Sequence, residues 1–293
     1  MTTGMRRIAL VLAFVPVAAH ANGPHGATAK SDFKTTGATT HNFGACGAKV
    51  LPLVEGNVWT YAGVLAPLPP DDKIKRISPA QPKTIVITVK SVDSKKGSDT
   101  VVTLEEKITT DLTKEEKKPI IDERTLTTTI TCSPTKFEIS PDSFFFAGEP
   151  GGYFGLKLDS FDRSKDTSWK LIGGGIGDKP WREDVVAKWE RVPTPGSDAK
   201  LGSGKLELER AFTPQQPEVV ITKLGTYHAE KLGLVTTGRV TNDGATPDAS
   251  GKLPAMELPA GWVSTIWTAE GVGVVQVLNP YAHQYQLVDA QLK

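Results

Sequence analysis

Apolar and polar residues alternate along most of the chain after Leu51. The clearest case is residues 124–132, where Leu126, Ile130 and Cys132 fall on one face and four threonines fall on the other. Successive side chains of a strand point to opposite faces, so alternation of this kind is typical of a half-buried antiparallel strand.

The same pattern recurs along the chain. We expect further strands at residues 57–61, 84–89, 100–108, 135–139, 168–172, 184–192, 205–212, 218–223, 226–232, 234–241, 262–269, 272–278 and 283–289. Apart from one possible helical turn at residues 113–118, the mature part shows no helical pattern. The sequence therefore predicts an all-β protein: an antiparallel, open or half β-barrel, or alternatively a β-sandwich, with long Pro- and Gly-rich loops.

The N-terminal residues have the pattern of an export signal. Arg6 and Arg7 precede eight apolar residues, and Ala19-His20-Ala21 has the small residues of a cleavage site. We expect a signal peptide at residues 1–21, cleaved near Ala21, and a soluble periplasmic or secreted product. An uncleaved anchor is the alternative, although the apolar run is shorter than the ~20 residues of a membrane span. The first cysteine comes too late for lipid attachment.

Composition divides the rest of the chain and limits its partners. Residues 22–50 contain few large apolar residues, so we expect a flexible N-terminal segment there and a single antiparallel β domain at 51–293. The 293-residue chain has 34 basic and 33 acidic residues. This balance gives no basic surface for nucleic acid. We also expect no membrane span after signal cleavage.

Two cysteines in an exported chain favour one disulfide, Cys46–Cys132. Free thiols are one alternative. A metal site that includes His41 is another, but the spacing fits no zinc pattern. We therefore expect no metal.

Catalytic motifs are weak throughout the sequence. The glycine-rich residues 171–178 and 201–206 depart from nucleotide-binding patterns. No G-x-S-x-G motif is present, and Glu105 and Glu106 should point to opposite faces of one strand. We therefore expect a protein without catalytic residues or cofactors, not an enzyme.

An aromatic stretch is the best candidate for a ligand site. Three consecutive phenylalanines cannot all face one side of a strand, so at least one should reach solvent, a partner or a cavity mouth. The segment 180–195 could cover it, or the residues could form an apolar or sugar-binding lip. The candidate ligand-binding residues are Phe144, Phe145, Phe146, Tyr153, Phe154 and Trp181.

Four motifs near the two ends of residues 51–289 carry a family resemblance. They are LPLVEGNVWTYAG (51–63), GTYHAEKL (225–232), WTAEGVGVVQ (267–276) and YQLVD (285–289). Together they resemble exported bacterial β-rich proteins of the open-barrel, lipoprotein-carrier-like (LolA/LolB-like) type. The resemblance implies an open barrel. From the residues themselves we expect Gly271 and Gly273 to form a hairpin, and Trp59 and Trp267 to be core anchors.

We therefore expect a non-catalytic exported protein that binds an apolar, lipid-like ligand or a cell-envelope partner. A purely structural or assembly protein of the envelope, without a ligand, is the alternative. An exported hydrolase is a more distant one, because it requires convergent carboxylates or a histidine-centred cluster.

Overall fold

A computed structural model describes residues 44–68, 78–95, 99–113, 118–133, 136–148, 156–164, 167–191, 202–258 and 262–293. Residues Phe33–Lys293 form one compact unit, and everything below concerns the described part of that unit. The predicted signal peptide, most of the predicted flexible segment and residues 114–117 of the possible helical turn lie outside the described residues.

The described chain is almost entirely β-structure. The strands are β1 (Val58–Val64), β2 (Thr84–Ser94), β3 (Thr100–Asp111), β4 (Ile121–Ser133), β5 (Lys136–Ile139), β6 (Leu156–Arg163), β7 (Trp181–Arg191), β8 (Ser203–Thr222), β9 (Gly225–Asn242), β10 (Ala255–Glu257), β11 (Val263–Ala269), β12 (Gly273–Leu278) and β13 (Gln284–Gln291). The expectation of an all-β antiparallel fold is confirmed.

All thirteen strands belong to one antiparallel sheet. Their order is β5-β4-β3-β2-β1-β13-β12-β11-β9-β8-β7-β6, and β10 pairs with β9 outside this path. Within the described residues the end strands β5 and β6 do not pair with each other, so the sheet is open. The first and last strands meet at its centre, where β1 pairs with β13 in the register Val58↔Gln291 to Val64↔Gln284.

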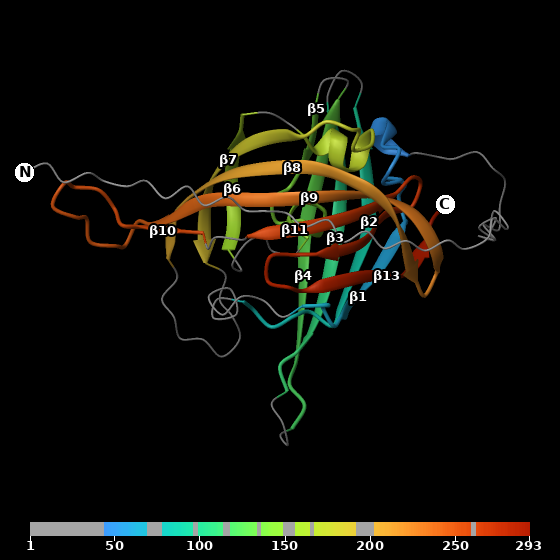
Figure 1. Cartoon of the computed structure of the whole chain (residues 1–293), viewed down its shortest axis with the longest axis horizontal. Coiled ribbons are helices and arrows are strands. Elements are labelled where there is room, and N and C mark those ends of the chain that lie inside the picture. Colours follow the sequence, from blue (N-terminus) through green and yellow to red (C-terminus); the bar gives the residue numbers. More distant parts are fainter. Residues whose placement is uncertain are drawn as a thin grey trace, which may run out of the picture. The chain divides into compact units, whose positions relative to one another are not determined.

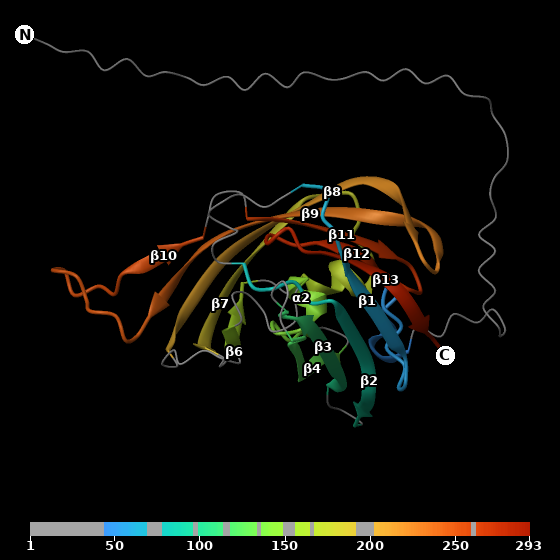
Figure 2. The same cartoon turned by 90° about the horizontal axis from the view of Figure 1, so that it is seen from below.

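The sheet curves so that its two halves face each other. In Figure 1, β3 and β4 run steeply and cross behind the long strands β8 and β9. Figure 2 shows the short helix α2 (Phe144–Ala147) between these two halves. A twisted sheet of this size can bury one face by curling around it. The apolar faces of both halves therefore form one core around α2.

Phe144, Phe145 and Phe146 form a helical turn, not a strand, which corrects our expectation. Ser143 caps the turn by accepting a hydrogen bond from Phe145 N–H, and Gly148 ends it with a left-handed φ of 69°. A serine before and a glycine after a short apolar segment are the usual helix boundaries. All three phenylalanines are buried, so the expectation that one reaches solvent or a cavity mouth is also wrong.

A second expected strand, at residues 168–172, is a π-helical turn, η3 (Trp169–Gly173). Its sequence alternates like that of a strand. The chain instead makes a wide turn, in which Gly174 N–H donates a hydrogen bond to Trp169 O. The sequence did not predict two strands, β6 and β10. A bulge between Leu158 and Ser160 breaks the alternation of β6, and β10 is only three residues long, all of them exposed.

The disulfide between Cys46 and Cys132 is confirmed, with the two Cα atoms 5.7 Å apart. Cys46 lies in the 3₁₀ turn η1 (Ala45–Gly47), and Cys132 lies near the end of β4. The bond ties the N-terminal segment to the half of the sheet that contains β4. The expected hairpin at Gly271 and Gly273 is also present between β11 and β12, with both glycines at positive φ.

Candidate functional site

Three charged side chains are buried in the core between the two halves of the sheet. Glu106, Glu183 and Arg210 each expose 2% or less of their surface. Each occupies a position that alternation assigns to the apolar face of its strand: Glu106 follows Leu104 on β3, and Arg210 lies between Leu208 and Phe212 on β8. Sequence reasoning missed them, although a charge at an apolar position of the alternation was the signal. Buried charges require partners, so their contacts define the site.

The Glu106 carboxylate binds the backbone at the start of α2. Its Oε2 accepts a hydrogen bond from Phe144 N–H at 3.0 Å, and its Oε1 accepts one from Thr128 Oγ1 at 2.7 Å. The pKa of Glu106 lies above its ordinary value, because burial raises it by more than the hydrogen bonds from Phe144, Ser143 and Thr128 lower it. The first N–H groups of a helix have no partner within the helix, so Glu106 supplies one.

The Arg210 guanidinium binds the backbone at the end of α2. Its Nη2 donates to Phe146 O at 2.9 Å, and its Nη1 donates to Glu183 Oε1 at 2.9 Å. The guanidinium also lies 4.2 Å from the centre of the Phe146 ring, a cation–π contact. Glu183 in turn accepts a hydrogen bond from Thr167 Oγ1 at 2.6 Å. Arg210 therefore connects α2 to β7 and to the segment before η3.

The phenylalanines of α2 fill the space at the centre of the sheet. Phe144 lies 4.6 Å from the ring of Tyr61 and 5.7 Å from that of Tyr285. Phe145 meets Trp59 edge to face at 5.9 Å. A four-residue helix thus supplies much of the apolar surface that the central strands β1 and β13 bury.

Of the remaining predicted ligand residues, the structure describes Trp181. Trp181, on β7, is buried and stacks on Phe212 at 4.8 Å, with Lys170 Nζ above its ring at 5.1 Å. Tyr153 and Phe154 lie outside the described residues. The structure thus brings together Phe144, Phe145 and Phe146. Trp181 connects to them through Phe212, because the Arg210 guanidinium lies over the rings of both Phe212 and Phe146. Whether any of these residues binds a ligand stays a prediction.

Two surface grooves accompany this core. One, of about 530 Å³, is lined by Asp162, Trp189 and Lys205 among others. The second, of about 340 Å³, lies beside Pro214 and Glu230. Charged or polar residues make up just over half of the lining residues of each groove.

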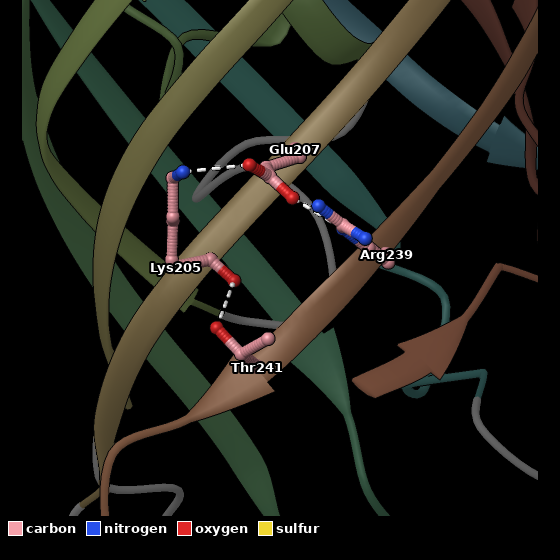
Figure 3. A network of polar contacts seen from close by, with 4 residues as sticks. All are labelled: Lys205, Glu207, Arg239 and Thr241. Atoms are coloured by element: carbon pink, nitrogen blue, oxygen red, sulfur yellow. Dashed lines mark hydrogen bonds and ion pairs between the residues drawn. The ribbon is translucent and has the colours of Figure 1, made fainter. Parts of the chain in front are cut away.

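The outer face of β8 and β9 carries paired charges. Figure 3 shows Glu207 between Arg239 and Lys205, with Lys205 Nζ 2.6 Å from Glu207 Oε1. The hydrogen bond from Arg239, and then that from Lys205, lower the pKa of Glu207 to about 2. Thr241 Oγ1 donates to Lys205 O beside this network. Exposed pairs of this kind keep the outer face soluble and add little stability.

Candidates for catalysis are few in the described part of the chain. No group of three His, Cys, Asp or Glu side chains there could hold a metal ion. One histidine meets a serine: His283 Nε2 lies 3.3 Å from Ser78 Oγ. Glu105 and Glu106 do point to opposite faces, as expected, since Glu105 pairs with Lys90 and Lys107 near the surface. No helix of the described residues is both long and apolar enough to cross a membrane.

Comparisons with known proteins leave the family open. No family model and no curated protein matches the chain. One similar solved structure is a "putative exported protein with YmcC-like fold" from Bacteroides fragilis: 12% identity, a TM-score of 0.43, and coverage of 84% of this chain and 100% of the other. Another is a "putative lipoprotein" from Parabacteroides distasonis, with 13% identity, a TM-score of 0.40 and coverage of 83% and 99%. Likenesses at this level carry no functional argument.

Proposed function

We propose that the protein is a non-catalytic exported protein that binds an apolar, lipid-like ligand between the two halves of its sheet. The observation that carries the proposal is the position of α2. Its three phenylalanines occupy the centre of the core, yet they belong to a four-residue segment and not to the sheet itself. Apolar volume supplied by so short a segment can be exchanged for the apolar chain of a ligand.

Polar contacts at the two ends of α2 favour such an exchange over a fixed core. Glu106 and Arg210 both bind backbone groups of α2, at Phe144 N–H and Phe146 O, and Arg210 also contacts the Phe146 ring. When α2 leaves, the head group of a ligand can accept the hydrogen bond that Arg210 now donates to Phe146 O. An acyl chain with a carboxyl or ester head group has the acceptor oxygen that this requires.

A fatty-acid titration tests the proposal. We expect one equivalent of a fluorescent long-chain fatty acid to bind the mature, disulfide-intact protein, and Phe145→Ala to bind it more tightly. Two further methylene groups buried in the vacated volume correspond to about 1.6 kcal/mol, or roughly tenfold in Kd. Phe137→Ala is the matched control, because it removes a buried phenylalanine from β5, away from α2.

Native mass spectrometry of the protein from its own host supports the titration without any substitution. A reproducible extra mass that leaves on organic extraction is expected. A bare mass, together with fatty-acid binding that is absent or equal in both phenylalanine variants, would overturn the proposal. The filled core would then favour the second candidate, a structural or assembly protein of the envelope.

A further inference from the structure

Trp169 is an exposed aromatic residue. It exposes 42% of its surface, whereas the other exposed large apolar residues whose side chains the structure describes are aliphatic residues and Met256. It opens the π-helical turn η3, in which Lys170 is exposed and Leu171, Ile172 and Gly173 are buried. π-Helical turns are rare in proteins, and those that occur often lie at functional sites.

The indole ring lies on a floor of glycine backbone. A Cβ atom at Gly173 would stand 2.2 Å from Trp169 Cε3, and one at Gly174 would stand 2.4 Å from Trp169 Nε1. Only residues without a side chain allow the ring to lie this close to the chain. One face of the indole is therefore covered, and an edge contact with Phe137, at 5.5 Å and 71°, holds its side.

The turn that carries the ring is fixed to the rest of the core. Lys49 N–H donates to Gly173 O at 2.5 Å, and Leu51 N–H donates to Ile172 O at 3.2 Å. The platform is therefore ordered before any ligand arrives, and a molecule that stacks on it loses little affinity to side-chain ordering.

The surroundings indicate what the free face binds. The neighbouring exposed residues are Lys49, Lys170 and Gly174, and the exposed aliphatic residues lie on other elements, such as Ile221 at the end of β8. A membrane surface or a protein hot spot requires an apolar cluster around the tryptophan. A single flat aromatic face with polar surroundings suits a sugar ring, which has an apolar CH face and a rim of hydroxyl groups.

We propose that Trp169 is a stacking platform for a pyranose ring, so that the protein also binds carbohydrate. The site is separate from α2. If the protein bound no carbohydrate, the proposed apolar-ligand function would still stand, because the two experiments use different ligands and different variants.

Calorimetric titration of the full mature protein with cellohexaose, maltohexaose and chitohexaose tests the proposal. We expect at least one of them to bind. Trp169→Ala should weaken that binding at least tenfold, and Trp169→Phe should weaken it only a few-fold because it keeps an aromatic face. Trp262→Phe, which changes a buried tryptophan that packs against Tyr281, is the control and should leave binding unchanged.

A second variant keeps the tryptophan and removes only the platform. Gly174 has φ −101°, which alanine adopts freely, so Gly174→Ala should fold but displace the indole and abolish sugar binding. The absence of binding by all three sugars, or binding that survives in Trp169→Ala, would overturn the proposal. Trp169-dependent binding to phosphatidylglycerol vesicles, in place of sugar, would overturn it in favour of a membrane surface.

Discussion

Glu106 and Arg210 hold opposite ends of α2 with opposite charges, from opposite halves of the sheet. The carboxylate of Glu106 on β3 accepts from Phe144 N–H at 3.0 Å, and the guanidinium of Arg210 on β8 donates to Phe146 O at 2.9 Å. This arrangement matches the polarity of a helical turn, whose N–H groups point to its start and whose carbonyl groups point to its end. The short segment thereby becomes the link between the two halves.

Removal of Arg210 should destabilise the protein strongly. In Arg210→Met, Glu183 is left buried without its cation, and we expect a loss of about 3–5 kcal/mol in the free energy of unfolding. Urea denaturation at pH 7 measures it. Arg182→Met, which breaks the exposed pair with Glu209, is the control and should cost at most about 1 kcal/mol. Equal losses in the two variants would contradict the proposed link.

The stability of the protein should depend on pH through Glu106. Because burial raises the folded-state pKa of this carboxyl above its ordinary value of 4.5, the folded state binds the proton more tightly than the unfolded state. Glu106 therefore contributes stability at low pH that is lost as the pH rises from about 4.5 through its folded pKa. Glu106→Gln lacks this loss.

We accordingly expect the stability of Glu106→Gln relative to the wild type to increase as the pH is raised from 4 to 8 in urea unfolding experiments. Glu105→Gln, one residue away on the other face of β3, is the control for the loss of a glutamate from this strand. A constant difference between Glu106→Gln and the wild type over this pH range would show that the carboxyl has an ordinary pKa.

Alternation predicted most of the sheet because burial of one face imposes a period of two on the sequence. It located β2, β3, β4 and β11 to within a few residues. It split β8 in two because none of the residues 213–219, where a bulge lies between Gln215 and Glu218, is buried. The local sequence pattern does not reveal a bulge, because the bulge is defined by how the strand pairs with its neighbour, where the extra residue is left unpaired.

The centre of the candidate site was harder to predict. Three successive phenylalanines have no strand pattern, and their burial depends on β3 and β8, which lie far from them in the sequence. Only the folded sheet brings Glu106 and Arg210 to the same four residues. The disulfide was predictable because an exported chain with two cysteines leaves one pairing.

Loss of the disulfide should cost more than loss of most single side chains. The bond joins residues 86 positions apart, and the chain-entropy model assigns a loop of this size about 4–5 kcal/mol. The double variant Cys46→Ser/Cys132→Ser should show this loss in urea denaturation, and the reduced wild type should show the same loss. If a reducing agent destabilised the double variant as well, the loss could not be assigned to this bond.

The network of Figure 3 should contribute little stability, and only above acidic pH. Arg239 and Lys205 lower the pKa of Glu207 to about 2, so its contribution is present above pH 4.5 and is lost as the pH falls toward 2. Glu207→Gln should cost about 0–1 kcal/mol at pH 7 and less in 1 M salt. A loss of several kcal/mol that does not change with salt would indicate a buried network instead.

The contact between Ser78 and His283 should not produce a nucleophile. The two side-chain atoms are 3.3 Å apart, slightly beyond the usual distance between a catalytic serine and its base. We expect a fluorophosphonate probe to add no mass to Ser78 in the intact protein, and Ser78→Ala to behave like the wild type. Labelling that disappears in both Ser78→Ala and His283→Ala would instead assign an acyl-transfer activity and reject the non-catalytic proposal.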